Sequence, residues 1–521
     1  MTAHSDDRDR CTVRSPLDSV PGDAPPARGQ PRAVLIIHGM GQQTRLSTLG
    51  DFSRGLVAAL RHRNPTSGEG DGPQLRSEMA LLDEVAVERL VLEIPGSVPR
   101  EVHLYEAWWA PLTEGTVHLR DVLSFLLRTG WRTLRYGSTH FDRWMFGAWR
   151  SFRIPGGSLL AVGATLALIL AGILLAIIGA AMALVTLVPG LGLAWPAASR
   201  HPELTTTLLG LLLVMLAAGG LGILAARRRS AATRVLSIGS AVVAGAVVIA
   251  GAGAMLWQTV GAEPHHIFPF LAGRWLTTPW GALPWGIFLV AALLVRRLLV
   301  QYVGDIVVYL EAHRVDRFAD LRSRIGRVVT DAARRVYGAR SGPGSEGDFL
   351  YEDVIIAGHS LGSVLGYDVL NRLINLDALR SNHCPKERLD VARRTRLLLT
   401  FGSPLDKTAW LFRMHSRRHA DAREALAALT QPLIVDRTVR PPWVNIHSPQ
   451  DPISGSLDLY DPPPGDDGPS VGGRPVTNRI DEEAWMPVAS HGQYWRTRAV
   501  FDTVLDALSE EPGRSPTGAT R

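Results

Sequence analysis

The middle of this 521-residue chain contains four long stretches without a charged side chain. They run over residues 158–188, 204–226, 235–257 and 275–295. Each stretch reaches the roughly 20 apolar residues that a helix needs to cross a bilayer. A helix of a soluble protein is seldom apolar on every face over such a length. The pattern therefore predicts a four-helix transmembrane insertion between two more polar parts of the chain.

The arginines around these stretches predict an orientation in the membrane. Several arginines precede the first stretch, four lie in the 227–234 segment, and two follow the fourth stretch, whereas the other two connecting loops carry one each. Loops on the cytoplasmic side are enriched in arginine and lysine. We therefore expect a multi-pass protein of the cytoplasmic (inner) membrane, in contact with membrane lipids, with both termini and the polar parts in the cytoplasm.

The rest of the chain divides by composition. Residues 1–30 and 510–521 are predicted to be disordered tails, and 156–300 is the transmembrane insertion. Residues 31–155 and 301–509 alternate short apolar runs with helical patterns, which favours α/β architecture. Four membrane spans return the chain to its starting side, so both parts can join one sheet. The expected fold is a mostly parallel sheet with helices on both faces, interrupted by the insertion.

Six apolar runs are predicted to be strands. They are Ala33–His38, Val85–Ile94, Val102–Glu106, Asp353–Ala357, Arg396–Thr400 and Val444–His447. Several of them are continuous β-branched and leucine runs, which is typical of parallel strands buried on both faces. Residues 141–152 carry apolar side chains at helical spacing and predict a helix, lying either at the membrane interface or in the core.

Composition excludes several classes of protein. A hydrophobic content of 46% excludes an intrinsically disordered chain, and two cysteines in this length exclude a disulfide scaffold. The net charge of +6 would suit nucleic acid, but all except two of the 55 basic residues are arginine in a Gly- and Pro-rich chain. Much of the excess also flanks the four apolar stretches, and no nucleic-acid motif accompanies it. Nucleic acid is therefore not expected as a partner.

The strongest local motif is Gly358-His359-Ser360-Leu361-Gly362, a G-x-S-x-G pattern. An apolar strand precedes it and a helical pattern follows, as in a nucleophile elbow, which raises the serine hydroxyl above a sheet. The motif glycines, Gly358 and Gly362, are needed because a Cβ would clash in so tight a turn. A second match around Ser470 lies in a loop rich in proline and glycine with no strand before it, and we interpret it as chance.

At this motif the chain resembles the α/β-hydrolase superfamily. The apolar run that ends in His38-Gly39-Met40-Gly41 resembles the H-G-x-G oxyanion loop of lipases and esterases. The resemblance implies that the backbone N–H groups of Met40 and Leu361 bind the oxyanion. By the same resemblance, His38 shapes the loop rather than transferring protons. The glycines that shape the two motifs are Gly39, Gly41, Gly358 and Gly362.

The same resemblance implies the partners of Ser360. The segment Trp443–Ile453 is similar to the strand and loop that present the triad acid, which makes Asp451 the expected acid. Asp406, after the preceding strand, is the alternative. His491 is the expected base because the superfamily orders its triad Ser, Asp, His along the chain. His447 is the second choice for the base, and it falls within a predicted strand.

The resemblance implies a serine hydrolase that cleaves carboxylic esters through an acyl-enzyme. The predicted membrane location suggests lipid esters as the substrates. Two alternatives stay open: an acyltransferase or thioesterase with the same triad, and a non-catalytic membrane scaffold or binding protein with a hydrolase fold. The sequence contains no metal-ligand cluster and no phosphate- or dinucleotide-binding motif, so no metal or cofactor is expected. It does not indicate a protein partner.

Overall fold

A computed structural model describes most of the two polar parts of the chain. The described residues are 12–13, 30–39, 43–64, 72–94, 100–113, 127–128, 130–131, 141–152, 316–341, 348–414, 426–451, 453–462, 475–486 and 489–509. Nearly all of them belong to one compact unit made of residues 1–116, 141–152 and 305–521, and the segments between form a second unit.

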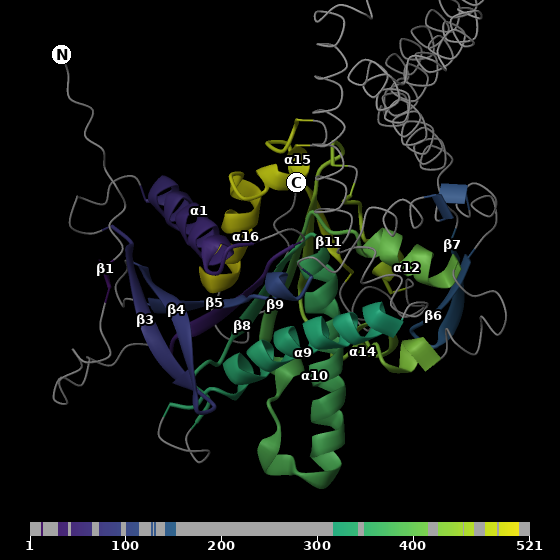
Figure 1. The fold of residues 1–521 in the computed structure, drawn as a ribbon, viewed down its shortest axis with the longest axis horizontal. Coiled ribbons are helices and arrows are strands. Elements are labelled where there is room, and N and C mark those ends of the chain that lie inside the picture. The colour runs from purple at the N-terminus through teal and green to yellow at the C-terminus, as the bar shows by residue number, and fades with distance from the viewer. Residues whose placement is uncertain are drawn as a thin grey trace, which may run out of the picture. The chain divides into compact units, whose positions relative to one another are not determined.

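Nine of the described strands of this unit form one sheet (Figure 1). In spatial order they are β1 (Thr12–Val13), β3 (Gln74–Leu82), β4 (Val85–Ile94), β5 (Arg100–Ala107), β2 (Arg32–Ile37), β8 (Val354–His359), β9 (Thr395–Phe401), β10 (Trp443–His447) and β11 (Thr477–Ile480). The strands from β5 to β11 run parallel. The pairs β3–β4 and β4–β5 are antiparallel. The sheet is therefore mixed, and β2 and β8 are neighbouring strands inside its parallel part.

The two central strands explain why distant segments share this sheet. Every residue of β2 and of β8 is buried. Strands covered by helices on both faces read as continuous apolar runs rather than alternating ones. Ala33 pairs with Val354 and Ile37 with Gly358, so the N-terminal and C-terminal parts of the chain lie side by side.

Among the described residues, four long helices cover the sheet, with α1 (Ser47–Arg63) and α16 (Arg498–Ser509) on one face and α9 (Asp316–Gly338) and α10 (Leu361–His383) on the other (Figure 1). Phe52 of α1 and Phe501 of α16 pack edge to face in the core on the first face, with ring centroids 5.5 Å apart. The short helices are α11 (Val391–Arg394), α12 (Leu405–Met414), α14 (Pro432–Val435) and α15 (Ser490–Gln493), with 3₁₀ turns at Ala110–Leu112, Pro385–Glu387 and Asp458–Tyr460.

The expected fold class is wrong in its four-helix transmembrane insertion. Among the described residues, no helix combines the length and the apolar character needed to cross a membrane. The longest described helices, α9 and α10, carry charged side chains and bury only part of their surface. The four stretches that predicted the insertion, 158–188, 204–226, 235–257 and 275–295, lie outside the described residues. The fold is therefore corrected to a mixed α/β sheet.

The predicted helix over 141–152 is also wrong. These residues form a β-hairpin of β6 (Phe141–Met145) and β7 (Ala148–Phe152). Phe146 and Gly147 at its tip both have positive φ, 52° and 82°, as a two-residue type I′ turn requires. Trp144 and Trp149 pair across the strands with ring centroids 5.5 Å apart. The apolar residues of one strand pair with apolar residues of the other, so their positions mirror each other about the two-residue turn. The result is an apolar spacing of three and four residues that resembles a helical pattern.

Candidate active site

Ser360 lies at the sharp turn between β8 and α10. Its backbone has φ 53° and ψ −126°, a conformation that non-glycine residues rarely adopt. The Ser360 N–H donates to the carbonyl oxygen of Phe401 at 3.0 Å, which ties the turn to the end of β9. This strained, anchored geometry sets Ser360 at the carboxyl edge of the parallel strands.

The two motif glycines allow the turn to pack against β2. A Cβ on Gly358 would lie 2.6 Å from the carbonyl oxygen of Gly362. A Cβ on Gly362 would overlap the carbonyl oxygen of Ile37 and lie 2.5 Å from that of His38. Because these neighbours are backbone atoms of the central strands and of the turn itself, they cannot move aside without distorting the sheet or the turn. The spacing of glycines in the motif therefore follows from close backbone packing.

The structure brings the three predicted triad residues together. The Nε2 atom of His491 lies 2.9 Å from the Oγ atom of Ser360. The Nδ1 atom of the same ring lies 2.9 Å from Oδ2 of Asp451. An ionised carboxylate only accepts hydrogen bonds, so Nδ1 carries the proton and Nε2 is left to accept from the serine hydroxyl. The three side chains come from the β8–α10 turn, the loop after β10 and α15.

Asp451 is held as an ionised carboxylate. Its side chain is fully buried, and Oδ1 accepts the Ile453 N–H at 2.9 Å. Burial alone would raise the pKa of Asp451, but the hydrogen bond and charge of His491, with the Ile453 amide and Ser454 hydroxyl, lower it to about 2. The carboxylate therefore stays charged and fixes the ring of His491.

Tyr494 is a site residue that the sequence did not point out. Its hydroxyl donates to Oδ2 of Asp451 at 3.0 Å and accepts the Ser448 N–H at 2.9 Å. Burial raises the pKa of Tyr494, so the phenol keeps its proton. The signal in the sequence was its position three residues after His491, one helical turn away. Tyr494 thus links the acid loop to the segment that carries the base.

His38 holds the end of β2 in place. Its Nδ1–H donates to the Gly39 carbonyl at 2.8 Å, and its Nε2 accepts the Trp109 N–H at 3.1 Å. The ring also stacks on Trp109, with centroids 4.8 Å apart. Burial lowers the pKa of His38 to about 4, against a smaller opposing effect of the Gly39 bond. These contacts give His38 a neutral, loop-shaping position away from the triad hydrogen bonds.

Of the two predicted oxyanion donors, the structure describes Leu361. Leu361 is the first residue of α10, where backbone N–H groups have no acceptor within the helix and the helix dipole is positive. Gly39 touches the nucleophile turn, since a Cβ there would lie 2.7 Å from the Cβ of Ser360. Met40 and Gly41 lie outside the described residues. The described half of the proposed oxyanion site is therefore the Leu361 amide.

The alternative residues occupy other positions. Asp406 lies in the first turn of α12 and pairs with Lys407, with Nζ 2.9 Å from Oδ2. His447 is the last residue of β10 and lies in register with Ile480 of β11. It is His491, and not His447, that bonds to Ser360. Ser470 lies outside the described residues.

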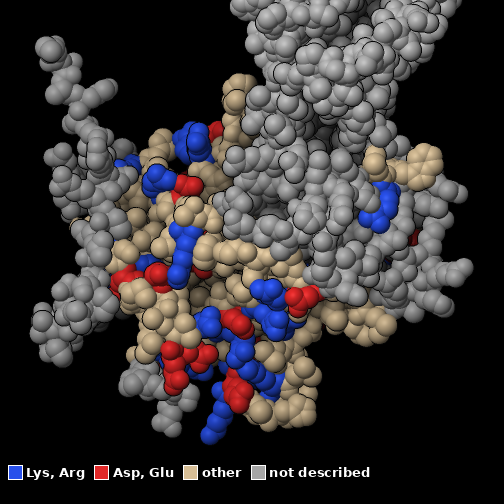
Figure 2. Space-filling model, viewed as in Figure 1, with Lys and Arg blue, Asp and Glu red and all other residues tan. Residues whose placement is uncertain are grey.

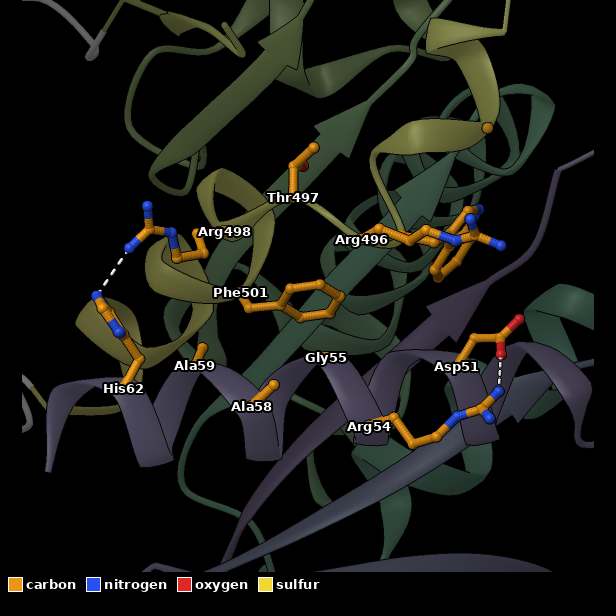
Figure 3. Close-up of a pocket in the computed structure, with 12 residues that line it drawn as sticks. Asp51, Arg54, Gly55, Ala58, Ala59, His62, Arg496, Thr497, Arg498 and Phe501 are labelled. Atoms are coloured by element: carbon orange, nitrogen blue, oxygen red, sulfur yellow. Dashed lines mark hydrogen bonds and ion pairs between the residues drawn. The ribbon is translucent and has the colours of Figure 1, made fainter. Parts of the chain in front are cut away.

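A groove of about 660 Å³ lies beside the segment that follows His491 (Figure 3). It runs between α1 and the residues from Gly492 to Phe501. On its walls Arg54 pairs with Asp51, and Arg498 bonds to His62. Neither Ser360 nor Asp451 lines it. Basic and acidic side chains intermingle over much of the described part of the face shown in Figure 2.

Comparisons of this chain with protein-family models, with curated proteins and with solved structures find no match. The chemistry of the described residues is therefore what bears on function. Among them, Ser360, His491 and Asp451 place a hydroxyl, an imidazole and a buried carboxylate in one hydrogen-bonded line.

Proposed function

We propose that this protein is a serine hydrolase that cleaves carboxylic esters through an acyl-enzyme on Ser360. The observation that carries the proposal is the unbroken line of hydrogen bonds from Ser360 Oγ through His491 to Asp451, with both contacts at 2.9 Å. A serine hydroxyl is a weak nucleophile until a neighbouring base removes its proton. The same order of contact, nucleophile to base to acid, recurs in unrelated hydrolases. The base must take the serine proton, and the acid must orient the base and stabilise its charged form.

In the first half of the reaction, Ser360 Oγ attacks the ester carbonyl carbon while its proton passes to Nε2 of His491. The ring becomes an imidazolium, which the charge of Asp451 stabilises through Nδ1–H. The negative charge that forms on the carbonyl oxygen is met by the Leu361 N–H at the start of α10. When the tetrahedral intermediate collapses, Nε2 returns the proton to the departing alcohol, and the acyl group stays on Ser360.

In the second half, water takes the place of the alcohol. His491 Nε2 removes a proton from water, the hydroxide attacks the acyl carbon, and the bond to Ser360 Oγ breaks. The proton on Nε2 goes back to Oγ and the carboxylic acid leaves. The narrower expectation of lipid esters depended on the transmembrane insertion, so the proposal is limited to carboxylic esters.

Labelling of the full chain with a fluorophosphonate probe tests this proposal, because the probe forms a stable bond only with an activated serine. We expect the wild type to be labelled and Ser360→Ala not to be. The matched control is Ser470→Ala, which removes the serine of the other G-x-S-x-G pattern and is expected to label like the wild type. A folded wild type that neither labels nor hydrolyses p-nitrophenyl esters would overturn the proposal, as would labelling that survives Ser360→Ala.

A further inference from the structure

His359 stands between the nucleophile turn and the segment that carries the base. It is the residue before Ser360 and the last residue of β8. Its ring lies 4.9 Å from the ring of His491 and 5.1 Å from that of Trp495, centroid to centroid. It also packs on Phe401 at 5.1 Å. One side chain therefore contacts both parts of the chain that must stay in register for proton transfer.

The polar contact of His359 is directed at the backbone of the base. Its Nε2 lies 2.9 Å from the carbonyl oxygen of His491. A carbonyl oxygen only accepts, so Nε2 carries a proton and donates to it. The bond reaches 132 residues along the chain, from the end of β8 to α15. It fixes the main chain of the residue whose side chain bonds to the neighbouring Ser360.

The surroundings of His359 are built to admit this ring. Gly402, at the end of β9, has φ +60°, and a Cβ there would lie 3.2 Å from Nε2 of His359. On the other side, a Cβ on Gly39 would lie 3.0 Å from Nδ1. Two glycines in the loops around Ser360 thus leave the room that the imidazole fills. The ring does more than fill this space, because its Nε2–H also donates to the carbonyl oxygen of His491.

The ring of His359 is neutral. Burial, with the neighbouring His491, lowers the pKa of His359 to about 3. During catalysis His491 becomes positively charged, and a second cation 4.9 Å away would oppose that charge. A neutral imidazole supplies the hydrogen bond without this repulsion.

We propose that His359 is a positioning residue of the hydrolytic reaction: its Nε2–H holds the backbone of His491 so that the imidazole of His491 stays within hydrogen-bond distance of Ser360. The inference rests on the proposed function. His359 acts through His491 and does not itself touch the reacting atoms. Loss of its donor shifts the base relative to the nucleophile, and misplacement by about 1 Å costs on the order of 100-fold in rate.

The test compares His359→Leu, which fills similar space without a donor, with His359→Gln, which keeps an N–H at the end of the side chain. Turnover of a p-nitrophenyl ester and the rate of fluorophosphonate labelling are measured on the full chain, with circular dichroism to check folding. We expect His359→Leu to lower kcat about 10- to 100-fold with little change in KM. His359→Gln should recover most of the loss. His103→Leu, at a buried histidine that contacts Glu101 and Tyr351, is the control and should keep kcat.

The outcomes separate this inference from the proposed function. An inactive, unlabelled wild type removes the proposed function. An active wild type with an equally active His359→Leu removes only the role of His359, as does an equal loss in the Leu and Gln variants. Should His359→Leu fail to fold, ¹⁵N spectra of histidine-labelled wild type decide: a proton on Nε2 of His359 supports the inference, and a proton on Nδ1 overturns it.

Discussion

Among single residues, the buried carboxylate of Asp451 determines what His491 can do. It receives hydrogen bonds from His491, Tyr494 and the Ile453 amide. Because these donors together outweigh the cost of burial, its pKa falls to about 2 and the carboxylate is charged at neutral pH. A charged acceptor at Nδ1 leaves Nε2 as the only nitrogen able to take the serine proton.

Replacing Asp451 with Asn is expected to lower kcat by about 10⁴-fold, because an amide does not hold the imidazole in the required tautomer or stabilise its charged form. Turnover of a p-nitrophenyl ester measures the effect. Asp406→Asn is the matched control, since Asp406 bonds to Lys407 instead, and its kcat should stay close to the wild-type value. A larger loss in Asp406→Asn than in Asp451→Asn would reverse the assignment of the acid.

Two buried histidines predict how stability depends on pH. The pKa values of His38 and His359 are lowered from 6.5 to about 4 and about 3. Between pH 6.5 and 4 the unfolded chain binds protons that the folded chain does not. The free energy of unfolding therefore falls as the pH falls, by up to about 1.4 kcal/mol per pH unit for each histidine.

Urea unfolding at pH 7, 6 and 5 checks this dependence on pH, with His359→Gln as the comparison. The variant should show a shallower decline because one of the two histidines is gone. A free energy of unfolding that stays level from pH 6 to 5 would contradict the neutral state of both rings.

At the scale of elements, the β8–α10 turn is positioned by direct contact between backbones. The first turn of α10 packs against the end of β2 at Gly362, where a Cβ would overlap the carbonyl oxygen of Ile37. Strand-to-helix packing at this distance leaves no room for a side chain. It also sets Leu361 and Ser360 next to the loop that begins at Gly39.

Gly362→Ala is therefore expected to destabilise the protein by about 1–3 kcal/mol, the usual cost of forcing extra atoms into a packed site. Gly50→Ala is the matched control, because a Cβ on Gly50 in α1 meets nothing within 4 Å. There, alanine should leave stability unchanged or raise it by up to about 1 kcal/mol through its higher helix propensity. Chemical denaturation of both variants gives the comparison, and equal stabilities would contradict the close packing of the turn.

For the whole molecule, the sheet unites parts of the chain that are far apart in sequence. Arg32 of β2 pairs with Asp353, just before β8, with Nε 3.3 Å from Oδ2. Arg396 of β9 approaches the same carboxylate at 3.9 Å. All three side chains are about nine-tenths buried. This cluster joins the first strand of the parallel region to two strands of the C-terminal part.

Asp353→Ala should lower the free energy of unfolding by about 3–5 kcal/mol, because it leaves two buried guanidinium groups without their shared anion. Asp51→Ala breaks an exposed pair with Arg54 on the surface of α1 and should cost less than about 1 kcal/mol. Urea unfolding followed by tryptophan fluorescence measures both. Similar losses in the two variants would show that the buried cluster does not help to hold the sheet.

Much of the parallel sheet could be predicted from local sequence. The runs at β2, β8, β9 and β10 are apolar and continuous, and strands form within one or two residues of the predicted positions. β3 and β11 were missed because they lie toward the sheet edges and carry mostly polar or half-exposed side chains. The 141–152 segment was misassigned because its apolar spacing fits a helix as well as a hairpin, and only the turn at Phe146 and Gly147 separates them.

The sequence by itself determined the β8–α10 turn at Ser360, because strand, glycines and serine occupy one short segment whose local geometry is set by the backbone. The order of motifs along the chain also pointed to Asp451 and His491. Only the tertiary structure decided which histidine meets Ser360 and which acid meets that histidine, since Asp406 in α12 and His447 in β10 carry the same chemistry nearby. The roles of Tyr494 and His359 likewise depend on contacts across 43 and 132 residues, and no local pattern encodes such distances.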